Sequence, residues 1–504
     1  MSELNLNRLD GRTITGALTR DVDVVIVGSG PAGTTAAREL SRSGARVLVI
    51  EAGRWFDASE FPRSAFDAMA LTYRDMGASV ALGLSPTPFV QAKMVGGSSP
   101  INGAICWRLP RDVYDEWLAA DPALGDALPW AELESVADEL DALLGVKPTD
   151  PAIAGMKNQL MARGAEALGL EHRPIRRNVA HCEGSGRCMQ GCPTGRKASV
   201  DATLLRDAED AGALVLSSTQ VTRIDVQSGR AVGVTGRTDA GAAVTVRARY
   251  AVILAASAIQ TPVLLMNSGL HHGPVGQHFQ CHPGVSMAGR FPEVVRMWEG
   301  ATQGHEVIGL RHEGLKFEAL GFGLGVMASR LVGVGRTLAR EVDDIAHQAD
   351  WGVAVRAKAH GRVHALGGRP LVFFSPSAQD IGRFRRGLRV LGELMLAAGA
   401  DHVSPGVKGF MPQASSVQDL VRLEREGPRS PAAFTSVFTH MFGTCRMGSA
   451  PSSSVVAPDF RHHRALGLYV ADSSVFPTSL GVNPQIPIMA MATLCARRVL
   501  AATT

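Results

Sequence analysis

The sequence predicts an α/β fold in which helices cover a parallel sheet. Two observations near the N-terminus support this prediction: an apolar run at 24–27 is followed by G-x-G-x-x-G at Gly28, Gly30 and Gly33, and a second apolar run occupies 47–50. A continuous apolar run is typical of a parallel strand that is buried on both faces. The order strand, glycine turn, helix, strand therefore predicts a Rossmann-like unit.

Each part of this unit suits a dinucleotide. The first glycine allows a tight turn, the second lets a pyrophosphate approach the backbone, and the third lets the helix pack on the strand. Glu51 ends the second run, where a carboxylate accepts hydrogen bonds from ribose hydroxyls and would repel the 2′-phosphate of NADP. These residues alone do not distinguish FAD from NAD.

Composition limits the remaining possibilities. A chain of 504 residues with 45% hydrophobic residues can bury a large core and would divide into two or more domains. The net charge of +4 and the absence of a basic block with aromatics argue against nucleic acid and leave a small molecule as partner.

The seven cysteines and the polar start predict a reduced, cytoplasmic protein. No run reaches the length of a transmembrane helix, so we predict none.

Four further segments carry a family resemblance. They are "AKMVGGSSPINGAICW" (92–107), "SAIQTPVLLMNSGL" (257–270), "FTHMFGTCRMG" (438–448) and "YVADSSVFPTSLGVNPQIPIMAMA" (469–492). With them the sequence resembles the glucose–methanol–choline (GMC) oxidoreductases. Within that family it looks most like bacterial alcohol dehydrogenases and long-chain alcohol oxidases. The second segment departs from the family pattern at its end, where His271 stands in place of a glycine.

The resemblance implies that the dinucleotide is FAD. It also implies the cofactor-binding residues outside the first unit, which are Gly96, Gly97, Ser98, Asn102, Val221 and Asp472. Paired glycines let the backbone approach a ligand closely, while serine and asparagine offer polar groups beside it. Some family members attach FAD through a histidine in the first segment. Because "GGSSPING" contains no histidine, we predict that FAD is bound non-covalently.

The resemblance also implies how the domains are arranged. A Rossmann-like FAD-binding domain is expected to interleave with a substrate domain built on an antiparallel sheet backed by helices. We assign 1–281 mainly to the FAD-binding domain, with inserted segments at about 55–90 and 110–165. Residues 282–432 form the predicted substrate domain, and 433–504 return to the FAD-binding domain with the catalytic pair.

The predicted substrate domain matches no motif that we recognise. Alternating small apolar and charged residues around a Gly-Arg turn predict a half-exposed hairpin at 351–366. The segment 380–400 places apolar residues on one helical face and arginines on the other. Aromatic residues are sparse, at 5%, which favours a mostly apolar alcohol over a stacked sugar and leaves a polyol or aminoglycoside open.

The likeness places the catalytic pair at His440 and Asn483 and implies FAD-dependent oxidation of an alcohol to an aldehyde or ketone, an EC 1.1 type of activity. FAD accepts the hydride at N5, and an imidazole with a pKa near neutrality suits the proton. His440 is the candidate general base, and Asn483 would orient the substrate oxygen. The electron acceptor is oxygen, a quinone or a cytochrome. A non-redox lyase or decarboxylase of the same family is an alternative.

Three cysteines, Cys182, Cys188 and Cys192, stand at C-x5-C-x3-C spacing in a glycine-rich loop. Thiolates suit iron–sulfur clusters and zinc, but this set lacks the fourth ligand of a structural zinc site, although His181 is adjacent. Some bacterial family members with a cytochrome partner have similar spacing and hold a three-iron four-sulfur cluster, so an iron–sulfur dehydrogenase stays open. We favour a plain reduced loop without metal.

Overall fold

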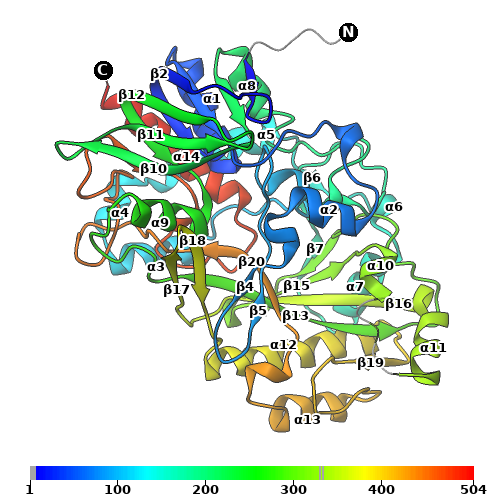
Figure 1. Ribbon diagram of the computed structural model, residues 1–504. Helices are drawn as coiled ribbons and strands as arrows, with labels where there is room; N and C mark the ends of the chain where they lie inside the picture. The colour runs from blue at the N-terminus through cyan, green and yellow to red at the C-terminus, as the bar shows by residue number, and fades with distance from the viewer. Residues whose placement is uncertain (1–6, 329–330, 332–333, 504) are drawn as a thin grey trace.

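The computed structural model describes the chain except residues 1–6, 329–330, 332–333 and 504. Figure 1 shows two parts: a sheet with helices around it forms the upper part, and a second sheet with two helices below it forms the lower part. The first sheet is largely parallel and the second is antiparallel. The predicted α/β class, with a parallel sheet and a separate antiparallel sheet, is therefore confirmed.

The first sheet holds eight strands in the described part of the chain. Across the sheet they are β1 (Arg8–Asp10), β9 (Leu214–Ser217), β3 (Val47–Ile50), β2 (Leu18–Val27), β12 (Ala243–Leu254), β11 (Arg230–Thr238) and β10 (Thr219–Gln227), with β21 (Leu468–Val470) also beside β12. The central strands β9, β3, β2 and β12 run parallel, and β11 and β10 extend one edge as antiparallel strands.

The glycine turn at the end of β2 leads directly into α1 (Pro31–Arg42). Proline is favoured in the first helical turn because its fixed φ suits the helix and its missing N–H would be unpaired there. α1 packs against α14 (Gln485–Ala501) and α8 (Leu204–Asp210). The N-terminal glycine motif is thereby joined to the C-terminal helix, although 451 residues (34–484) separate them in sequence.

The second sheet holds seven antiparallel strands among the described residues. Across the sheet they are β19 (His402–Ser404), β13 (Gln280–Arg290), β16 (Gln348–Val355), β15 (Leu315–Leu320), β14 (His305–Val307) and β7 (His172–Pro174), with β20 (Val437–Phe442) also beside β13. α12 (Ala378–Ala397) packs on this sheet. Its buried face includes Ile381, Phe384, Leu388 and Leu391, which confirms the amphipathic helix predicted near 380–400.

The hairpin predicted at 351–366 is wrong. Trp351 lies in β16, a central strand whose neighbours are β13 and β15. The segment predicted to pair with it is β17 (Arg362–Leu366), which pairs instead with β18 (Arg369–Phe373). The alternation holds along each strand, but β16 ends at Val355, and the next residue, Arg356, donates to Glu116 and to the Ser479 carbonyl.

The remaining elements surround the two sheets. The helices are α2 (Ala65–Thr72), α3 (Arg111–Ala120), α4 (Ala123–Ala127), α5 (Trp130–Leu143), α6 (Pro151–Ala154), α7 (Met156–Ala167), α9 (Ser257–Asn267), α10 (Leu324–Ala328), α11 (Arg336–Asp343) and α13 (Val417–Glu426). The short strands are β4 (Val80–Ala81), β5 (Thr87–Pro88), β6 (Lys147–Pro148) and β8 (Arg176–Arg177). Among the described residues, no helix combines the length and apolarity that a bilayer crossing needs. The predicted domain boundaries stay predictions.

Candidate active site

The two predicted catalytic residues come from opposite sides of the junction between the sheets. His440 lies on β20, which pairs with β13 in the second sheet. Asn483 lies in the loop 477–484, which precedes α14 of the first part. Both side chains are half-buried.

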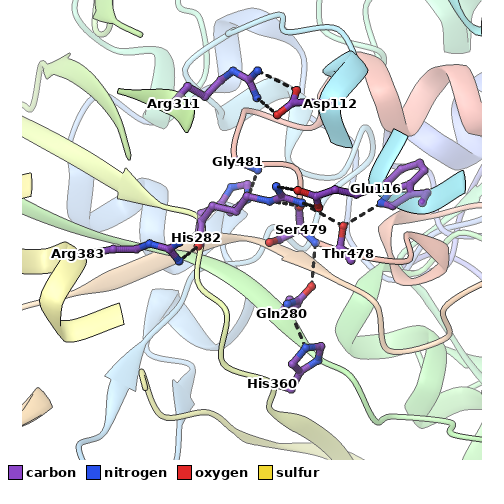
Figure 2. Close-up of polar contacts among 12 residues, drawn as sticks. Asp112, Glu116, Gln280, His282, Arg311, His360, Arg383, Thr478, Ser479 and Gly481 are labelled. Atoms are coloured by element: carbon purple, nitrogen blue, oxygen red, sulfur yellow. Dashed lines mark hydrogen bonds and ion pairs between the residues drawn. The ribbon is translucent and has the colours of Figure 1, made fainter. Parts of the chain in front are cut away.

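Two hydrogen bonds fasten the loop 477–484 to β13, and Figure 2 shows both. The Ser479 amide donates to Gln280 Oε1 at 2.9 Å, and the Gly481 amide donates to His282 Nε2 at 2.8 Å. From the other side, Arg356 Nε donates to the Ser479 carbonyl at 2.8 Å. The loop is therefore held against the strand that pairs with the strand of His440.

Asn483 is oriented by a buried lysine on β15. Lys316 Nζ donates to Asn483 Oδ1 at 2.9 Å, and it pairs with Glu306 at 2.8 Å and with Glu318. Burial alone would lower the pKa of Lys316, but the two carboxylates raise it above its ordinary value. The ammonium group therefore stays charged next to the amide.

His440 is neutral near pH 7. Its burial, and secondarily the positive charge of Lys316, lower its pKa to about 4. His282 Nδ1 lies 3.2 Å from His440 Nδ1, and burial together with the neighbouring rings and cations holds the pKa of His282 well below its usual value. Two uncharged imidazoles therefore face each other at this site.

The Gly481 amide determines where the hydrogens of these rings lie. An N–H group can only donate, so His282 Nε2 accepts and the neutral ring carries its hydrogen on Nδ1. His282 Nδ1–H then donates to His440 Nδ1, which leaves the hydrogen of His440 on Nε2. In this arrangement His440 Nε2 is a donor. It becomes an acceptor only when the hydrogens of both rings shift and the Gly481 amide gives up its bond.

The glycines predicted to bind the pyrophosphate lie where added side chains would collide. Gly28 has φ +101°, and a Cβ there would lie 2.4 Å from the Ala255 carbonyl oxygen. A Cβ on Gly33 would lie 1.9 Å from the Gly28 carbonyl oxygen. Gly97 has φ +56°, and its Cβ would lie 2.7 Å from Gly30 Cα. The N-terminal glycine motif and the "GGSS" segment therefore meet through backbone alone, which suits a ligand that needs close backbone approach.

Glu51 links these segments. Its carboxylate accepts hydrogen bonds from the amide and hydroxyl of Ser29, both at 2.9 Å, and from the Gly53 amide at 2.8 Å. Ser29 Oγ in turn accepts from the Gly96 amide at 3.1 Å. Thr219, two residues before Val221 on β10, donates to the Glu51 carbonyl. Three of the predicted cofactor-binding positions (28, 51 and 96) thus lie around the carboxyl ends of β2 and β3, and Val221 follows two residues after the Thr219 contact.

Other predicted positions extend this region toward Asn483. Asn102 Nδ2 donates to Gln485 Oε1 at 2.6 Å, at the start of α14. The buried Gln485 Nε2 has no hydrogen-bond partner among the described residues, which fits a polar ligand beside it. Ser98 is exposed next to Gly97. Their predicted place beside the isoalloxazine of FAD stays a prediction.

Asp472 mainly holds other segments of the protein together. Its carboxylate accepts hydrogen bonds from the amides of Ser257 and Ser474 and from the hydroxyl of Thr261. Burial raises the pKa of Asp472, while these donors act against the rise. The residue therefore holds the start of α9 against the segment that follows β21. Its predicted contact with the flavin ribityl chain stays a prediction.

The three cysteines line one small pocket. Among the described residues, no three His, Cys, Asp or Glu side chains are grouped to hold a metal ion. Arg177 Nη2 lies 3.0 Å from Cys188 Sγ, and its Nη1 lies 4.0 Å from Cys182 Sγ. The guanidinium group of Arg177 therefore lies beside two of the three thiols.

Sequence reasoning missed the groups that surround the predicted catalytic pair. These are His282, Glu306, Lys316 and Glu318. In "LKFEAL" Lys316 and Glu318 alternate with apolar residues, which is also the pattern of a strand with one face in solvent. The structure instead buries both side chains, and no local feature of the sequence marks them or His282 as buried polar groups.

Comparisons with known proteins agree with this geometry. Two family models described as "GMC oxidoreductase" match residues 22–284 and 346–492. An uncharacterised GMC-type oxidoreductase of Mycobacterium tuberculosis is 35% identical over 93% of this chain and 74% of its own length. A long-chain-alcohol oxidase of Arabidopsis thaliana is 29% identical over 93% of this chain and 67% of its own.

Solved structures share the fold at low sequence identity. A pyridoxine 4-oxidase from Mesorbium loti superposes with a TM-score of 0.71 at 18% identity, covering 94% of this chain and 98% of that one. A formate oxidase of Aspergillus oryzae also gives 0.71, at 17% identity, covering 96% and 98%. The whole described architecture is therefore that of a known enzyme fold.

Replacing Gly97 with valine should reduce flavin binding by at least about tenfold, because a Cβ at φ +56° would press on Gly30. Flavin content after purification and titration of the apoprotein would measure the loss. Gly145→Val is the matched control, since Gly145 has φ +59° but no atoms within 4 Å of its Cβ. Equal flavin affinity in the two variants would contradict the close approach between Gly97 and Gly30.

The tautomer assignment can be measured directly. In protein labelled with ¹⁵N-histidine at pH 7, His440 should show a protonated Nε2 and an unprotonated Nδ1, because His282 donates to Nδ1. The His440→Asn variant would identify the signals by their loss. A His440 that carries its hydrogen on Nδ1 would contradict the assignment.

Proposed function

The chain belongs to the GMC oxidoreductase family, a family of FAD-binding flavoenzymes, and from this we propose that it oxidises an alcohol CH–OH group to a carbonyl, an EC 1.1 type of reaction. FAD is its cofactor, and the absence of histidine from "GGSSPING" supports a non-covalent attachment. The single observation that carries the proposal is that the loop 477–484, which contains Asn483, is fastened to β13, the strand that pairs with β20 of His440.

Alcohol oxidation needs one group that removes the hydroxyl proton and another that steadies the oxygen as charge develops on it. Asn483 suits the second role, because its Oδ1 faces Lys316 and its Nδ2 is left to donate to a substrate oxygen. His440 suits the first role, because it is neutral above a pKa of about 4. FAD, when bound, supplies the hydride acceptor.

The hydrogen on His440 Nε2 adds a condition to this mechanism. Nε2 can take the substrate proton only after the ring hydrogen has moved to Nδ1, and His282 must then accept at its own Nδ1. That shift places a hydrogen on His282 Nε2, where the Gly481 amide now donates. Gly481 lies two residues before Asn483. A substrate that binds the side-chain amide of Asn483 would therefore contact the same short loop that contains the Gly481 amide.

The alcohol that we propose is mostly apolar. The relatives named as long-chain-alcohol oxidases support this class, and so does the small share of aromatic residues. The same names support oxygen as electron acceptor. A quinone or cytochrome acceptor would be recognised by turnover with a dye in place of oxygen.

Anaerobic mixing with a series of alcohols tests the proposed function. We expect the absorbance of the oxidised flavin to disappear with long-chain alcohols, because hydride transfer reduces it. Oxygen or a dye is then admitted to the reduced protein, and the faster reoxidation identifies the acceptor. A flavin that stays oxidised with every alcohol, while an elimination or decarboxylation substrate is consumed, would show a non-redox reaction instead.

Substitution of the catalytic pair tests the roles. His440→Ala should lower kcat/KM by about 10²–10⁴-fold, and Asn483→Ala by about 10²–10³-fold, because a proton acceptor and an oxygen-binding donor are lost. The kcat/KM of the unmodified enzyme should fall as the pH drops through about 4, where His440 becomes cationic. His364→Ala, a change at an exposed histidine on β17, is the control. Retention of full activity in both site variants would overturn the assignment.

A further inference from the structure

Lys316 is the one buried cation that touches the predicted catalytic amide in the described part of the chain. The side chain is 1% exposed, and its strand turns Leu315 and Phe317 into the core of the second sheet. Its ammonium group has three hydrogens, and they are directed to Glu306, Glu318 and Asn483. The position of this ammonium group is therefore fixed from three directions.

An ammonium group donates and cannot accept, so the Asn483 atom that faces it must be the carbonyl oxygen. The NH2 group of the same amide then points away from Lys316, and it makes no hydrogen bond within the described residues. We propose that Lys316 is a positioning residue that presents the Asn483 NH2 group to the substrate oxygen and strengthens it as a donor. This inference rests on the proposed alcohol oxidation.

The carboxylates that hold Lys316 are themselves held by other elements. Glu306 accepts from Trp107 Nε1 and from Arg173 Nε, each at 2.8 Å. Glu318 accepts from Gln303 Nε2 at 2.6 Å. The acids Glu306 and Glu318 balance the cations Lys316 and Arg173, and this balance lowers the cost of burying the charge of Lys316. A lysine held this firmly can orient an amide without being displaced by substrate.

The charge of Lys316 acts on the chemistry in two ways. Through the amide it favours negative charge on the substrate oxygen, which grows as the hydroxyl proton leaves. Directly it opposes a positive charge on His440, together with the burial of that ring. The other titratable or charged groups that face this region are His282 on β13 and Arg356 after β16, and both are retained in the variants below.

The experiment compares Lys316→Met with the charge-balanced Lys316→Met/Glu318→Gln, both loaded with FAD. In each we expect kcat for an alcohol to fall about 10–100-fold with KM changed less than about threefold, because the lost contact acts on the transition state. The acid limb of the kcat/KM profile should move upward from about pH 4, since one of the two causes of the low His440 pKa is gone. The double variant guards against failure to fold, because it leaves Glu306 paired with Arg173.

A double-mutant cycle with Asn483→Ala separates positioning from general support of the fold. If Lys316 acts through the amide, the lysine substitution should cost less than about threefold when Asn483 is already alanine. Lys157→Met, which removes a comparably buried lysine that donates to the Glu299 carbonyl, should keep kcat per bound flavin within about twofold.

An acid limb that stays at about pH 4 would overturn the direct effect of the Lys316 charge on His440, and additive losses in the cycle would overturn the positioning role. A loss that only follows lower flavin content or thermal stability would overturn it as well. Failure of the unmodified enzyme to reduce its flavin with any alcohol would instead overturn the proposed function. The two failures are therefore distinguishable.

Discussion

The attachment of the loop 477–484 to β13 is the constraint on which the site depends. A backbone amide at each end of a short span, at Ser479 and at Gly481, donates to a side chain of that strand. The loop continues into α14, which packs on the helix that follows the first glycine motif. The loop and α14 therefore link Asn483 both to the second sheet and to the helix after the glycine turn that is predicted to bind the cofactor.

The electrostatics of the site follow from burial. A buried imidazole loses the hydration that its cation needs, and Lys316 adds repulsion, so His282 and His440 stay neutral. The nearby charges are balanced within the Lys316 cluster, and the groups left to face a substrate oxygen are hydrogen-bond donors in the resting arrangement. Such a site favours an oxygen that gains negative charge and disfavours a cationic group at the same place.

The sequence predicted the elements whose signals are local. The β2–α1–β3 unit and α12 have periodic apolar positions, and the family resemblance supplied His440 and Asn483. The contacts that the sequence could not predict are those that depend on the order of the strands in the two sheets. β16 and β17 each alternate correctly, yet they belong to different sheets. Likewise, Lys316 and His282 are far from Asn483 in sequence, so nothing local marks them as neighbours of its loop.

Two buried lysines each hold neighbouring segments through hydrogen bonds, but their pKa values shift in opposite directions. Lys197, beside the cysteine loop, donates to the carbonyls of Pro100, Asn102 and Cys188 and so supports the segment that contains the "GGSS" glycines. Its partners are largely neutral carbonyls, and burial lowers its pKa. Lys316 meets two carboxylates, and its pKa rises. The lysine beside the predicted catalytic amide is thus the one whose charged form its partners favour, as expected if that charge acts on the substrate oxygen.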